Sequence, residues 1–339
     1  MFARVGRLYV AELMKALRQR LPLAAVIVVL LVAFLSLYGS MRSIEGQIKQ
    51  ELGESYEREP GGIPGPNADD PPRTARTKKS FFPSLPASKG YECLAHTWKY
   101  SLELGAFFLL VFGSLLVSSE VAQGTVRTTL QRPIRRIDFM LAKVLILLTA
   151  TLFLAVVIAS AGLLLVHVLV GFGNVTDLQW ETEFRAHSNT GPEAASPEAT
   201  EPTSARRPAW LFFYGSEMKA FALKSFLLLL LPFACAGFLG FFISSIVSSP
   251  GTAVGIAVIV HYVLSALLEI FKGWQRYYFE SYFEQALSWL LNVSQGIKTH
   301  LTPFKAVSWT SSEVYVPLAY IVAFVVVSVL VFQRRDVVT

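Results

Sequence analysis

Six long apolar runs constrain the fold of this chain more than any other feature. Each has about 20 residues with few or no charges, the length at which a helix crosses the hydrocarbon core of a bilayer. Lipid offers no partners for backbone amides, and the runs lack the alternation of barrel strands, so each is expected to be a helix. The runs are residues 21–38, 100–118, 144–166, 225–247, 252–271 and 314–332. The sequence therefore predicts an all-α integral membrane protein with six transmembrane helices.

Several functional classes lack their sequence signatures. With 53% apolar residues, the chain is unlike an ordinary soluble domain. It has no G-x-x-x-x-G-K-[ST] phosphate loop, no H-E-x-x-H zinc pair and no G-x-S-x-G nucleophile turn. We therefore expect no catalytic residue, metal site or cofactor in this chain. The basic excess suits a membrane surface, and nothing indicates a nucleic-acid partner.

The distribution of Lys and Arg predicts the orientation. These residues are dense in three short segments: residues 1–20, the loop 119–138 and the end after residue 332. Short loops rich in Lys and Arg stay in the cytoplasm, which places both termini and the 119–138 loop there. The connections 41–98 and 172–216 would then lie outside. Their Pro, Gly, Ser and charged residues are typical of flexible inserts.

The third outer connection has a different pattern. Phe279 and Phe283 begin a run of apolar residues at helical spacing, and Tyr277, Tyr278 and Trp289 are of the type that lies at membrane interfaces. The pattern predicts a segment half-inserted into the outer leaflet. It would serve either as a lid over a translocation path or as an interfacial anchor.

Residues 1–20 have the periodicity of an amphipathic helix. At 100° per residue, Val5 and Tyr9 share one face, whereas Arg7, Lys15 and Arg18 share the other. Such a helix is expected to lie on the inner leaflet with its basic face toward anionic headgroups. The alternative is a cleaved signal peptide, but no convincing small-x-small cleavage site follows the apolar run.

The loop between the second and third runs is short, basic and able to form a helix. Gly124 and Thr125 are typical of a helix start, and Pro133 prevents the same helix from continuing. A helix of about two turns is predicted between them. Its Arg residues either set the topology alone or contact a partner in the cytoplasm.

This loop and its flanks resemble the ABC type-2 exporter permease family. Members show a Glu near the end of span two, then Gly-Thr, a short coupling helix, Pro followed by a basic residue, and a Lys that opens span three. The corresponding residues here are Glu120, Gly124, Thr125, Arg127, Leu130, Pro133, Arg135, Arg136 and Lys143. The order of spans agrees over nearly the full length, although the first two outer connections are longer than in compact members.

The resemblance implies a permease subunit of an exporter in the cell membrane. Two copies, identical or paired with a related chain, would each dock a cytoplasmic ABC ATPase subunit that binds ATP and Mg²⁺. The cargo would be an amphiphilic or envelope-related substrate. Glu120 is expected to pair with Arg127 or Lys143 and so join the loop to the spans. The main alternative is a membrane scaffold that transmits ATPase-driven force to an outside partner without transport; a membrane-embedded enzyme is a third.

Ionisable residues within the spans are the remaining candidates. Glu103 and Glu269 fall near the outer ends of spans two and five, and His261 falls within span five. They either line a transport pathway or form hydrogen bonds within the bundle. Lys143 and Lys224, at span ends, are of the kind that extend toward the headgroups.

Overall fold

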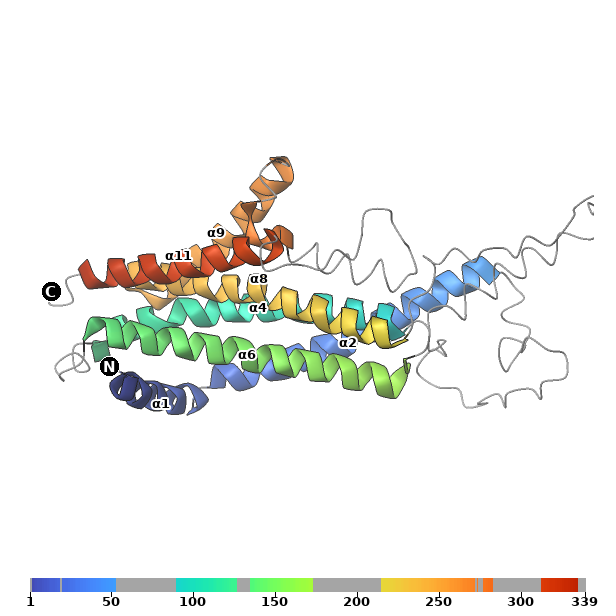
Figure 1. Cartoon of the computed structure of the whole chain (residues 1–339), viewed down its shortest axis with the longest axis horizontal. Helices are drawn as coiled ribbons and strands as arrows, with labels where there is room; N and C mark the ends of the chain where they lie inside the picture. Colours follow the sequence, from blue (N-terminus) through green and yellow to red (C-terminus); the bar gives the residue numbers. More distant parts are fainter. Residues whose placement is uncertain are drawn as a thin grey trace, which may run out of the picture.

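The chain folds into long helices packed side by side. The computed structural model describes residues 2–18, 20–52, 90–126, 135–172, 215–271, 273, 277–282 and 312–334. Its principal helices are α1 (Phe2–Arg18), α2 (Arg20–Leu52), α4 (Gly90–Ala122), α6 (Arg136–Leu169), α8 (Gly215–Ile246), α9 (Pro250–Ile270) and α11 (Ser312–Arg334). Figure 1 shows α2, α4, α6, α8 and α11 running lengthwise, with α1 foreshortened across one end. The all-α fold expected from the sequence is confirmed.

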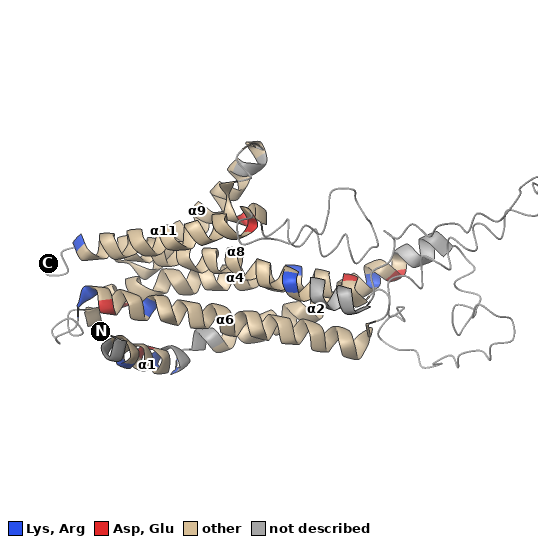
Figure 2. Cartoon of the chain, in the orientation of Figure 1, with Lys and Arg blue, Asp and Glu red and all other residues tan. Residues whose placement is uncertain are grey.

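Six helices are long and apolar enough to cross a membrane. They are Leu23–Gly46, Gly90–Ala122, Arg136–Leu169, Ala222–Ile246, Pro250–Leu267 and Ser312–Arg334. Figure 2 shows Lys, Arg, Asp and Glu near the ends of the described helices, with an uncharged stretch between them. We call the end that holds α1, the C-terminus of α4 and the N-terminus of α6 the α1 end, and the opposite one the far end. The expected number of spans is confirmed by helix length and composition.

The helices extend beyond the apolar runs that predict them. α2 continues to Leu52 and α4 begins at Gly90. Residues 41–52 and 90–98 are therefore helical, although the sequence favours a flexible connection from 41 to 98. Glu92, His96 and Lys99 lower the hydropathy of this part of α4 without interrupting its helix. The apolar run thus marks where lipid is expected and not where the helix ends.

α4 and α8 form the centre of the bundle, and α8 is the most buried of the six candidate spans. At their crossing, a Cβ atom on Gly240 would overlap the carbonyl oxygen of Leu110, and one on Gly113 would overlap that of Gly237. Small residues allow helix backbones to approach closely where lipid gives no hydrophobic driving force between helices. The glycines therefore set the distance between these two helices.

Large side chains fill the space on either side of this crossing. Toward the far end, Trp98 of α4 packs against Phe226 of α8, with ring centroids 4.8 Å apart. Toward the α1 end, Phe139 of α6 stacks on Phe332 of α11 at 5.5 Å. Phe139 and Phe332 lie in one apolar cluster with Phe112 of α4 and Phe238 of α8, which packs α6 and α11 against the central pair at the end that forms the site.

Candidate functional site

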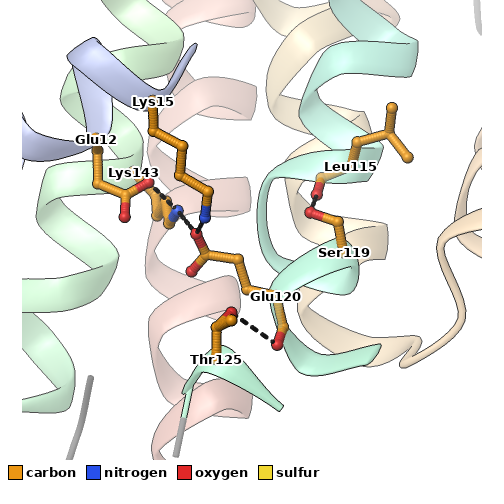
Figure 3. A network of polar contacts seen from close by, with 7 residues as sticks. All are labelled: Glu12, Lys15, Leu115, Ser119, Glu120, Thr125 and Lys143. Atoms are coloured by element: carbon orange, nitrogen blue, oxygen red, sulfur yellow. Dashed lines mark hydrogen bonds and ion pairs between the residues drawn. The ribbon is translucent and has the colours of Figure 1, made fainter. Parts of the chain in front are cut away.

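A network of four charged side chains joins three helices at the α1 end. Glu120 lies in the last turn of α4 and Lys143 two turns into α6, while α1 contributes Glu12 and Lys15. The Nζ atom of Lys143 lies 2.8 Å from Oε1 of Glu120 and also donates to Glu12. Lys15 donates to the same Oε1 of Glu120. Figure 3 shows these side chains converging from the three helices.

The central pair of this network is shielded from solvent. The side chain of Lys143 is 2% exposed and that of Glu120 is 4% exposed, whereas that of Lys15 is 43% exposed. Desolvation of buried charges is costly and is offset only when each ion keeps well-placed partners. Two carboxylates and two ammonium groups balance here, so the network as a whole carries no net charge.

α1 is held in place beside this network by its apolar face. Val5 is buried, and the hydroxyl of Tyr9 is hydrogen-bonded to Oγ1 of Thr149 on α6 at 2.8 Å. Val10 and Met14 are exposed on another side of the helix. α1 thus has one face against α6 and a second apolar strip available to lipid, in agreement with an interfacial helix.

The end of α4 shows how the chain turns from the network into the loop. Gly124 has a φ of +69°, a left-handed conformation that favours glycine after a helix C-terminus. Its amide donates to the carbonyl of Val121 at 3.1 Å. The hydroxyl of Thr125 then donates to the carbonyl of Glu120 at 3.2 Å. Gly124 and Thr125 therefore tie the start of the loop to the residue at the centre of the network.

The other residues expected at the loop have different positions. Arg135 is exposed at the start of α6, and Arg136 donates from Nη1 to the backbone oxygen of Gln333 at 2.8 Å, which links α6 to the end of α11. Arg127, Leu130 and Pro133 lie outside the described residues, as does most of the predicted coupling helix.

The expected pairing of Glu120 with Lys143 is present, but two expectations for lysines are wrong. Lys143 does not extend toward headgroups, because its Nζ atom is held by Glu12 and Glu120. Lys15 turns from the basic face of α1 to Glu120.

Glu12 is not among the residues expected from the sequence. The sequence nevertheless contains a pattern that indicates it, because Glu12 is an acidic residue on the apolar face of α1, seven positions after Val5 and three after Tyr9.

The pathway candidates lie on two helices, α4 and α9, and the structure describes the side chains of Glu103 and His261. Glu103 is exposed on α4, and the side chain of Glu269 lies outside the part of the chain that is described. Nε2 of His261 on α9 lies 3.7 Å from Oε1 of Glu280, which belongs to the segment 277–282 after α9. Ser265, one turn after His261, donates to Oε2 of Glu280. His261 is therefore part of a second polar cluster, between α9 and the segment 277–282.

The segment 277–282 is anchored by buried aromatic rings. Tyr278 and Phe279 pack against Tyr320 of α11, with ring centroids 6.4 Å and 5.6 Å from it, and lie in one apolar cluster with Cys235 of α8. Burial raises the pKa of the Tyr278 hydroxyl well above its usual range, so this group remains protonated at neutral pH. Residues 283–311, which hold the rest of the predicted half-inserted segment, lie outside the described residues.

These features define a multi-pass membrane protein in which a buried charge network joins an interfacial helix to the two spans that flank a basic loop. The chain belongs to the ABC-2 family of transporter proteins, whose family model matches residues 7–337. The match covers nearly the whole chain and agrees with the resemblance seen in the sequence. Members are membrane subunits of transporters that associate with an ABC ATPase, in general as dimers. A search of curated proteins found no match.

Proposed function

We propose that this chain is the permease subunit of an ABC exporter, with its α1 end in the cytoplasm and loop 119–138 as the docking site of a separate ATPase subunit. The network of Glu12, Lys15, Glu120 and Lys143 is the observation that carries the proposal. It joins α4 and α6, which flank the loop, to α1. Movement of the loop would then displace all three helices together. ATP and Mg²⁺ would bind the partner subunit.

The proposal includes a second permease copy, identical or related. α9 supports this because Ile259, Tyr262 and Val263 are among its many exposed apolar residues, and Figure 1 shows it diverging from the bundle. The substrate would be amphiphilic or derived from the cell envelope and would move outward. Both termini would be cytoplasmic, in the cell membrane. The Lys and Arg residues concentrated around the α1 end support this orientation.

Substitution Glu12→Gln tests the proposal. It removes the contact between α1 and Lys143 but leaves Lys143 paired with Glu120 inside the bundle. We expect the variant to fold and bind its ATPase, while the number of substrate molecules moved per ATP falls about tenfold, because an ion pair of this partly buried kind is worth more than 1 kcal/mol. The ratio is measured in proteoliposomes that contain the ATPase.

Glu45→Gln is a matched control for this test. Glu45 forms an ion pair with Arg42 at the opposite end of α2, and its side chain is 16% exposed, against 18% for Glu12. Glu45→Gln is expected to keep the wild-type ratio. If Glu12→Gln also keeps it, the network does not link α1 to the loop. If both variants lower the number of substrate molecules moved per ATP equally, the effect is not specific to the α1 end.

A scaffold that transmits force to an outside partner is the second candidate, and helix length favours it. α2, α4, α6 and α8 have 33, 33, 34 and 32 residues. Each is therefore about 50 Å long, against about 30 Å of hydrocarbon. They extend past the span at the far end and offer a rigid platform there. An exporter is expected to hydrolyse ATP faster with an amphiphile, whereas a scaffold would respond to an outer protein partner and not to amphiphiles.

A further inference from the structure

The outer face of α1 carries an apolar strip and, beside it, a basic strip. Val10 and Met14, which are 57% and 54% exposed, form the apolar strip. Lys15 and Arg18, which are also exposed, form the basic strip. At 100° per residue, all four lie within about 140° of one another, on the side of the helix opposite Tyr9, which is hydrogen-bonded to α6. The helix is therefore amphipathic along the face that it does not bury in the bundle.

The chain itself holds α1 close to the membrane surface. α1 ends at Arg18, and the first candidate span begins at Leu23, five residues later. Figure 1 shows α1 foreshortened across one end of the lengthwise helices. In a helix that crosses the end of a span in this way, an apolar strip can contact acyl chains while the basic strip beside it contacts headgroups. The outer face of α1 is therefore a surface that faces lipid.

The outer face of α1 has cations and no acidic residue to neutralise them. Glu12 is the only acidic residue of α1, and it accepts from Lys143 in the charge network. Arg18 forms no ion pair or hydrogen bond with any residue that the structure describes. Lys15 and Arg18 are three positions apart, the spacing at which side chains on a helix are neighbours. Together they complement a single phosphate group.

Lys15 can bind such a phosphate without leaving the charge network. Its ammonium group has three N–H donors, and one of them is used on Oε1 of Glu120. Its side chain is 43% exposed, so the group can be approached from outside the bundle. Glu120 also keeps Lys143, whose Nζ atom is 2.8 Å from the same Oε1. An anion at Lys15 would therefore share the ammonium group with Glu120 and compete with it.

We propose that Lys15 and Arg18 bind the phosphate of an anionic phospholipid whose acyl chains lie along Val10 and Met14, and that Lys15 is shared between this phosphate and Glu120. Phosphatidylglycerol has the required negative charge. Phosphatidylcholine has the same phosphate, but its choline cancels the charge. A soluble phosphate lacks the contact with the apolar strip. The site requires neither ATP nor a transported substrate, so it does not depend on the exporter function above.

A fluorophore attached through Ala11→Cys reports which lipids lie against this face. Ala11 is exposed one turn before Lys15, whereas the native residues Cys93 and Cys235 are buried and should not react. The labelled full chain is placed in phosphatidylcholine nanodiscs with increasing fractions of a lipid whose brominated chains quench the fluorophore. We expect brominated phosphatidylglycerol to bind about tenfold more strongly than brominated phosphatidylcholine, because each Lys or Arg at the surface attracts anionic lipid.

Two variants and a control locate the site. Lys15→Gln and Arg18→Gln are each expected to lower the preference for phosphatidylglycerol about fivefold, the effect of one positive charge near the membrane surface. Arg18 lies outside the charge network, so its variant should fold normally. Arg42→Gln is the matched control, because it removes one exposed positive charge from the opposite end of α2. It should keep the preference.

A second pair of variants tests whether Lys15 is shared with Glu120. Glu120→Gln removes the charge that competes for Lys15 and is expected to raise the preference about threefold. Glu12→Gln removes an equal charge from the same network, but Glu12 accepts from Lys143 and not from Lys15. It should leave the preference close to that of the wild type. Equal effects of the two substitutions would overturn the sharing of Lys15.

Three other results would overturn the site itself. The first is equal binding of the two brominated lipids. The second is an Arg18→Gln variant that keeps the preference, or an Arg42→Gln variant that loses it as well. The third is loss of the preference in millimolar inorganic phosphate at constant ionic strength, which would show that the face binds the free anion and not a lipid.

Discussion

Substitution Lys143→Met is expected to lower the free energy of unfolding by about 3–5 kcal/mol, the cost of removing one member of a buried ion pair. Methionine keeps much of the side-chain volume, but it leaves Glu12 without its partner and Glu120 with Lys15 alone. The loss arises from the carboxylate charge that remains buried. It is measured by titration with sodium dodecyl sulfate in mixed micelles.

Lys99→Met is the matched control, because Lys99 also lies on a long helix but is half-buried and contacts the ring of Tyr100 at 5.8 Å. It should cost less than about 1 kcal/mol. Exchange of Glu120 and Lys143 restores the central pair but sets like charges against Lys15 and Glu12, so it should rescue only part of the loss. Exchange of all four charges should rescue most of it. If the variant with all four charges exchanged is no more stable than Lys143→Met, the loss of stability does not come from charge pairing.

Local patterns predicted the spans and the interfacial helix because both are properties of short stretches. About 20 uncharged apolar residues suffice to indicate a transmembrane helix, whatever it packs against. The periodicity of residues 1–20 likewise requires no knowledge of α6. Helix ends were less predictable. The hydropathy signal stops where charged residues begin, as at Lys99, whereas backbone hydrogen bonding in α4 continues outward to Gly90.

The candidate site was predictable only in part, because its partners come from distant parts of the chain. Glu120 and Lys143 flank one loop, so the antiparallel spans bring them together. Glu12 and Lys15 are more than 100 residues away, and nothing in their local pattern states which helix α1 contacts. The contact of His261 with Glu280 likewise depends on how the chain returns after α9.

The crossing of α4 and α8 requires glycine for a reason that acts on the backbone itself. The nearest atoms to a Cβ on Gly240 are the carbonyl oxygen of Leu110 and the amide and hydroxyl of Ser114. The backbone atoms of α4 cannot change rotamer to make room. Any side chain at this position must therefore separate the two helices and loosen the packing of the neighbouring core.

Substitution Gly240→Ala is thus expected to destabilise the protein by about 1–3 kcal/mol, the range for overpacking a core. Gly39→Ala in α2 is the matched control, because a Cβ there meets no atom within 4 Å. It should be neutral or stabilising by up to about 1 kcal/mol, since alanine favours helix more than glycine does. Both values come from the same detergent titration. Equal effects would contradict a close contact at Gly240, whereas opposite signs would show that backbone proximity, and not helix propensity, selects glycine at this crossing.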